Sequence, residues 1–114
     1  MNYRLLDASK LEYIAVGSAA DVLPGQRMFV EIDGEPIVVF NIAGEWYAIA
    51  DLCSHDNGPL GEGDLDGREI ICPRHGARFD VTSGRVTAYP AVEDIPAYPV
   101  RVIDGQIEVG LPAL

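Results

Sequence analysis

Residues 51–76 read DLCSHDNGPLGEGDLDGREIICPRHG, and this stretch holds every cysteine and every histidine of the 114-residue chain. The four residues fall into two short motifs, Cys53-Ser54-His55 and Cys72-Pro73-Arg74-His75. A cysteine and a histidine one or two residues apart can turn toward one centre when the backbone between them loops. Two matched motifs that use up every thiol and every imidazole indicate a metal site rather than buried thiols and incidental imidazoles.

The two motifs leave two kinds of metal site open. Tetrahedral zinc accepts two thiolates and two imidazoles, and it would staple a small domain. Zinc sites of that composition usually take a close pair of cysteines from one segment and a close pair of histidines from another. Here each motif supplies one of each. This arrangement suits two metals, with both thiolates on one and both imidazoles on the other, as in a Rieske-type [2Fe–2S] cluster.

Around the motifs, short apolar runs punctuated by turns predict an all-β chain. The run at 45–50 is almost continuously apolar, as expected of a strand buried on both faces. A helical turn capped by Ser18 is the one helix signal. Strands are expected at residues 27–32, 36–42, 45–50, 69–72, 77–81, 85–88, 98–103 and 106–111.

Residues 51–66 break this strand pattern. They contain five acidic residues, three glycines and no lysine or arginine, with little apolar periodicity. A structureless stretch of this length is uncommon in a small domain and more often carries function than not. Because most of it lies between the two cysteines, we interpret it as an insertion that carries the site.

The composition excludes several classes of protein. With 18 acidic and 8 basic side chains the net charge is −10, which argues against nucleic acid or an anionic membrane as partner. Two cysteines cannot form a disulfide-dense secreted scaffold. The longest apolar run, at 46–50, is far below the roughly 20 residues that span a bilayer, and no signal-like segment is visible. We expect one domain, residues 1–114, that is monomeric and cytoplasmic.

The two motifs, extended by Gly76, match the Rieske signature C-x-H…C-x-x-H-G. From about residue 13 to 111, the chain resembles the small Rieske-type ferredoxins of bacterial ring-hydroxylating dioxygenase systems. The resemblance implies the Rieske fold, in which three antiparallel sheets form a basal sandwich with an inserted cluster-binding subdomain. In this chain the subdomain would span residues 52–81.

The resemblance also assigns the ligands of one [2Fe–2S] cluster. Cys53 and Cys72 would hold the inner iron, and His55 and His75 would hold the outer iron near the surface. The family covers its cluster with a third, proline-bearing loop, which Tyr89-Pro90 matches.

The resemblance implies an electron carrier and not an enzyme. It would take single electrons from a flavin-dependent ferredoxin reductase and pass them to a terminal oxygenase. Once the four ligands are engaged, the sequence has no cysteine or histidine left for catalysis. Two alternatives remain: the small Rieske subunit of an assimilatory nitrite reductase, and a zinc-stapled binding module without a redox role.

Six positions beside the ligands set the expected properties of the site. Gly58 and Arg74 stand where high-potential Rieske proteins carry a disulfide, and Ala77 and Phe79 stand where those proteins carry hydroxyl donors. Without such donors the potential should lie at the low end of the Rieske range, which reaches about −150 mV.

Gly58 and Gly76, which lack a Cβ, would let backbone N–H groups approach the sulfurs. Arg74 and Asp56 would either help to dock a partner or be solvated loop charges.

Overall fold

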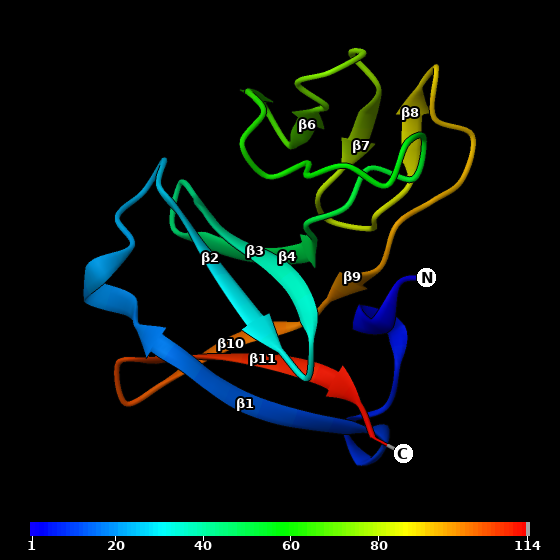
Figure 1. The fold of residues 1–114 in the computed structure, drawn as a ribbon. Helices are drawn as coiled ribbons and strands as arrows, with labels where there is room; N and C mark the ends of the chain where they lie inside the picture. The colour runs from blue at the N-terminus through cyan, green and yellow to red at the C-terminus, as the bar shows by residue number, and fades with distance from the viewer. Residues whose placement is uncertain (114) are drawn as a thin grey trace.

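Strands β3 (Glu35–Ile42) and β4 (Glu45–Ala50) lie at the centre of the computed structural model, which describes residues 1–113 (Figure 1). In β3, Val39 points into one hydrophobic core and the adjacent Phe40 into another, and both are fully buried. Successive side chains of a strand point to opposite faces, so a strand covered on both faces needs an unbroken apolar run. The predicted double burial of residues 45–50 is confirmed from Tyr47 onward.

Two sheets form the basal sandwich. The first has the order β2-β3-β4-β9 and the second the order β1-β11-β10, with antiparallel pairing throughout. Their remaining strands are β1 (Leu11–Ser18), β2 (Arg27–Ile32), β9 (Ala97–Tyr98), β10 (Val100–Ile103) and β11 (Gln106–Pro112). Three 3₁₀ helices accompany them, η1 (Tyr3–Leu5), η2 (Ala8–Lys10) and η3 (Ala19–Asp21).

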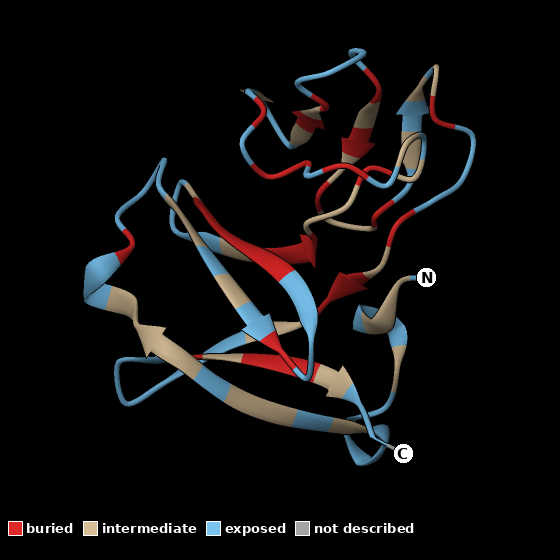
Figure 2. Cartoon of the chain, in the orientation of Figure 1, coloured by how far each residue is buried: buried red, intermediate tan, exposed pale blue. Residues whose placement is uncertain are grey.

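The third sheet lies at one end of the molecule, beyond the β3–β4 side of the sandwich (Figure 1). It is antiparallel, in the order β5 (Leu65–Asp66), β6 (Glu69–Ile71), β7 (Arg78–Asp80) and β8 (Val86–Ala88). Figure 2 shows buried segments both in the central strands and in this sheet. One core joins them, built among others from Val38, Phe40, Ile49, Cys53, Leu60, Ile70, Cys72, Phe79 and Val81. The predicted all-β class with three antiparallel sheets is confirmed.

Tight turns connect most strands where the sequence predicted them. The turn between β2 and β3 places Asp33 and Gly34 at φ 51° and 80°, and the final hairpin turns at Asp104 and Gly105 in the same conformation. Short polar residues and glycine tolerate this left-handed region best.

One strand expectation was wrong. The strand expected at 98–103 is divided at Pro99, because β9 pairs with β4 while β10 pairs with β11 in the other sheet. The sequence prediction also missed two strands. The short β5 lies at the end of the stretch expected to be structureless. The longer β1 is irregular, because its pairing with β11 shifts register between Ala15 and Gly17.

The long segment after β4 is held against the sandwich by two charged side chains. From β2, the Arg27 Nη1 donates to the carbonyls of Gly61 and Gly63, the latter at 2.6 Å, and its guanidinium lies over the ring of Phe40. Asp51 Oδ1 accepts the N–H groups of Leu60 and Gly61 at 2.9 and 2.6 Å. The acid-rich stretch predicted to be a functional loop is therefore an ordered one.

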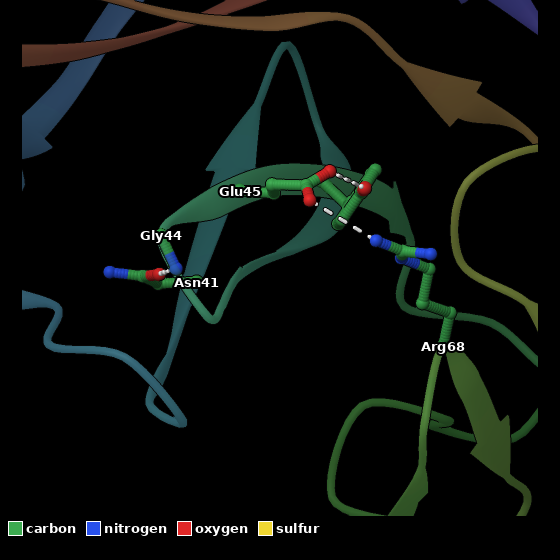
Figure 3. A network of polar contacts seen from close by, with 5 residues as sticks. Asn41, Gly44, Glu45 and Arg68 are labelled. Carbon is green, nitrogen blue, oxygen red and sulfur yellow. Dashed lines mark hydrogen bonds and ion pairs between the residues drawn. The ribbon is translucent and has the colours of Figure 1, made fainter.

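A second contact joins the third sheet to the exposed first residue of β4, Glu45 (Figure 3). Glu45 accepts hydrogen bonds from the Tyr47 hydroxyl at 2.6 Å and from Arg68 Nη2 at 3.1 Å. These two donors hold the pKa of Glu45 below its ordinary value. The neighbouring β3–β4 turn is braced by Asn41, whose Oδ1 accepts the Gly44 N–H at 2.9 Å.

Within residues 1–113, no helix combines the length and the apolar character that crossing a membrane would require.

We predict that Arg27→Ala destabilises the protein more than Arg68→Ala. Arg27 makes two partly buried charged hydrogen bonds, and such bonds contribute about 1.5–3 kcal/mol each. The exposed Arg68–Glu45 pair should contribute about 0–1 kcal/mol. Denaturant unfolding of the three proteins measures both effects, and equal losses would show that Arg27 does not anchor the segment.

Candidate metal centre

The two cysteine–histidine motifs form loops with the same backbone plan. We call residues 53–58 the first ligand loop and residues 72–77 the second. In each, the cysteine N–H donates to the carbonyl five residues on, and the fourth residue on donates its N–H back to the cysteine carbonyl. These bonds measure 2.8 and 2.8 Å in the first loop and 2.7 and 3.0 Å in the second. The repeated plan brings each cysteine and the histidine that follows it to the same end of the third sheet.

Each ligand loop reverses direction at the fourth residue after its cysteine. Asn57 has φ 60° and Gly76 has φ 78°, so both occupy the left-handed region. Asparagine and glycine are the residues that adopt this conformation most readily. A Cβ added to Gly76 would meet no atom within 4 Å, so glycine is required there by its backbone conformation and not by space. The sequence carries this signal in the matching positions of CSHDN and CPRHG.

Both predicted cysteine ligands lie inside the protein. Cys53 and Cys72 are 0% and 2% exposed, form no disulfide, and belong to the core that joins the third sheet to β3 and β4. Burial raises the pKa of the Cys53 thiol, and the neighbouring Cys72 side chain raises it further. A thiolate at Cys53 is therefore disfavoured unless a nearby positive charge offsets the burial.

Both predicted histidine ligands lie at the surface. His55 is exposed, the His75 side chain is 49% exposed, and their ring centroids are 5.1 Å apart at an interplanar angle of 87°. The structure therefore places the two thiols beside each other inside the protein and the two imidazoles beside each other at its surface. A single tetrahedral zinc would gather the four donors around one point. Donors separated into a buried and an exposed pair fit a group with two ends.

Asp56 is the acidic residue closest to the histidines. One donor atom each from His55, Asp56 and His75 lies within 4.8 Å of the others. Two histidines and a carboxylate can bind a single iron. The Asp56 Oδ1 accepts the Gly58 N–H at 2.9 Å. Its Oδ2 is buried and accepts no hydrogen bond from the described residues, although Arg74 Nε lies 3.2 Å away and His75 Nε2 3.9 Å away.

These contacts set the charge state of Asp56. The N–H of Gly58 donates to the Asp56 carboxylate. That hydrogen bond, with Arg74 nearby, lowers the pKa of Asp56 below its ordinary value. Asp56 is therefore held as a carboxylate that partners Arg74, which sequence reasoning did not connect with it.

A third segment lies beside the first ligand loop. Ser54 Oγ donates to the carbonyl of Glu93 at 2.5 Å, which attaches residues 89–93, a segment that contains the cis Tyr89–Pro90 bond. Tyr89 and Val92 in this segment are 81% and 71% exposed. The proline-bearing loop implied by the resemblance thus adjoins the first ligand loop and presents these two side chains at the surface.

The positions expected to lack hydroxyl donors are buried against the thiols. Ala77 and Phe79 are 0% exposed and belong to the same core as Cys53 and Cys72. Neither side chain carries a polar atom, so neither can donate a hydrogen bond toward the ligands.

Comparison with known proteins finds similarity over most of the chain. The sequence pattern of the Rieske [2Fe-2S] domain matches residues 12–99. The ferredoxin component of the naphthalene 1,2-dioxygenase system of Pseudomonas putida is 33% identical over 101 residues, covering 89% of this chain and 97% of that protein. The 3-phenylpropionate/cinnamic acid dioxygenase ferredoxin subunit of Escherichia coli K12 is 41% identical over 95 residues, covering 82% of this chain and 88% of that protein.

Solved structures agree with the sequence comparison. The ferredoxin of carbazole 1,9a-dioxygenase from Nocardioides aromaticivorans superposes with a TM-score of 0.80 at 35% identity, covering 85% of this chain and 95% of that one. A ferredoxin solved in complex with the oxygenase of a carbazole 1,9a-dioxygenase gives a TM-score of 0.81 at 33% identity, covering 90% and 96%.

We predict that Gly76→Ala lowers the stability of the protein and that Gly76→Asn lowers it less. An alanine in the left-handed region costs about 1–2 kcal/mol, whereas asparagine tolerates it, as Asn57 does in the first ligand loop. Each kcal/mol corresponds to about 4–8 °C in the thermal midpoint of a small domain. Thermal unfolding of the three proteins checks the order, and an unaffected alanine variant would contradict the conformational requirement.

Proposed function

This chain belongs to the Rieske [2Fe–2S] domain family, and we propose that it serves as the ferredoxin component of a ring-hydroxylating dioxygenase system. The observation that carries the proposal is the division of four ligands between two matched loops, with thiols buried and imidazoles exposed. Its relatives are named as ferredoxin components or subunits of dioxygenases, which favours an electron carrier over the nitrite reductase subunit. Family membership also favours the cluster over a structural zinc.

We propose that Cys53 and Cys72 hold the inner iron and that His55 and His75 hold the outer iron. Two donors at each end are the ligand set of a Rieske cluster, which accepts and releases one electron at a time when it is bound. The buried cysteines exclude water from one end of the site, and the exposed histidines bring the other end to the surface. We treat residues 52–81 as the cluster-binding subdomain of a single domain, 1–114.

We propose two partners for the exposed histidine edge: a flavin-dependent ferredoxin reductase and a terminal oxygenase. A related ferredoxin has been solved in complex with its oxygenase, which supports the second partner. The net charge of −10 would speed encounter with basic partner surfaces, particularly at low salt. Exposed Tyr89 and Val92 beside the first ligand loop would add apolar contact. We place this carrier, as a monomer, in the cytoplasm.

Replacing either proposed histidine ligand tests the assignment. We expect purified protein to contain two irons and two acid-labile sulfides per chain, in keeping with one [2Fe–2S] cluster. The His55→Ala and His75→Ala variants should lose the Rieske-type EPR spectrum of the dithionite-reduced protein. Arg101→Gln, on the distant strand β10, provides the control that should keep it. Zinc without sulfide, or an unchanged spectrum in either histidine variant, would refute the proposal.

A tyrosine at position 79 should raise the midpoint potential. Phe79 is fully buried in the core shared with both cysteines, where a hydroxyl could donate toward a ligand. Such a donor stabilises the more negative reduced form, and removing donors lowers Rieske potentials. Redox titration of Phe79→Tyr, with Phe79→Leu as a control without a hydroxyl, measures the change. Equal potentials in these two variants would show that no donor is missing at this position.

A further inference from the structure

Asp56 reaches from the first ligand loop to the second. Its Oδ2 lies 3.2 Å from Arg74 Nε, and its Oδ1 accepts the Gly58 N–H of its own loop at 2.9 Å. Arg74 stands between Cys72 and His75, and Asp56 follows His55 directly. Within residues 1–113, no other ion pair between a lysine or arginine and an acidic residue joins the two ligand loops.

The surroundings leave Arg74 as the nearest charge to a partly buried Asp56. The Asp56 side chain is 18% exposed and that of Arg74 59% exposed. The buried Asp56 Oδ2 accepts no hydrogen bond from the described residues, so its contact with Arg74 is one between opposite charges. A Cβ added to Gly58 would lie 3.1 Å from Asp56 Oδ1 and 3.2 Å from Arg74 Nη1, so a larger residue there would require these side chains to shift by a few tenths of an ångström.

The ion pair lies where the resemblance implies a covalent link between the ligand loops of some Rieske proteins. Gly58 and Arg74 stand where the resemblance places the disulfide that joins the ligand loops of high-potential Rieske proteins. In this chain a carboxylate and a guanidinium join the loops at that place instead. A salt link is reversible and screened by salt, unlike a disulfide.

We propose that Asp56 and Arg74 form an ionic clasp that holds the two ligand loops together and in which each charge offsets the effect of the other on the neighbouring histidines. The proposal rests on the proposed function, because it concerns loops that hold a cluster. Asp56 and Arg74 act as positioning residues: neither is a ligand. The negative charge of Asp56 lowers the midpoint potential and the positive charge of Arg74 raises it, so each offsets the influence of the other.

The clasp predicts different consequences for stability and for potential. Breaking it from either side should speed cluster loss by about 1.4- to 5-fold, which corresponds to the 0.2–1 kcal/mol measured for comparable ion pairs. Removing the negative charge of Asp56 should raise the midpoint potential, and removing the positive charge of Arg74 should lower it. A purely structural loosening would instead move both potentials in the same direction.

A double-mutant cycle separates these effects. The variants are Asp56→Asn, Arg74→Gln and the double variant, with Arg74→Lys as the charge-conserving rescue. Arg101→Gln is the matched control, because it breaks an exposed arginine–glutamate pair in the basal sandwich. Two measurements are made on each protein: the rate at which the visible absorbance bleaches with a chelator at low and high salt, and the midpoint potential by redox titration.

The clasp predicts that both single variants bleach faster than wild type, that the double variant bleaches no faster than either, and that high salt narrows the differences. The two single variants should shift the potential in opposite directions, while the double variant and Arg74→Lys stay close to wild type. Additive bleaching rates, unchanged rates, or potential shifts of the same sign would overturn the clasp. A wild-type protein without iron and sulfide would overturn the proposed function instead, so the two failures are distinguishable.

Discussion

The double burial of the β3–β4 hairpin is the constraint on which the rest of this structure depends. One face of the hairpin closes the basal sandwich, and the other forms the floor of the core that contains both cysteines. Because β4 is buried up to Ala50, the first ligand loop begins at the end of a fixed strand. Asp51, the next residue, accepts hydrogen bonds from the N–H groups of Leu60 and Gly61, which follow that loop. The site is thus built outward from the best-packed part of the fold.

A second principle is the use of one loop design twice. The same pair of backbone hydrogen bonds closes both ligand loops, and both turn through a left-handed residue, Asn57 or Gly76. Two copies of the design lie in one subdomain, so their cysteines enter the core together and their histidines share the surface. This arrangement buries the cysteine end of the proposed cluster and exposes its histidine end. The buried end protects the cluster of an electron carrier from water, and the exposed end allows a partner to approach it.

The two ligand loops contain a paired acidic and basic residue, in contrast to the acidic excess of the whole chain. The protein is strongly acidic, with a net charge of −10. Beside the histidines, Asp56 is paired with Arg74, while the adjoining segment exposes Tyr89 and Val92 together with the acidic Glu93 and Asp94. For the electron carrier that we propose, this surface would attract basic partners over long distances and so raise the encounter rate.

The sequence by itself determined the fold class and most strands and predicted the four proposed ligands, because these depend on local spacing and on alternation that neighbouring residues reveal. It could not place β1, whose register shift hides any simple pattern, nor divide residues 98–103 between two sheets. Tertiary structure alone decided that Arg27 anchors the acid-rich segment and that Asp56 contacts Arg74. Those contacts join residues 18 to 36 positions apart, and such pairings are set by how the sheets pack. A spacing pattern can therefore predict ligands, but only the packed fold decides which side chains surround them.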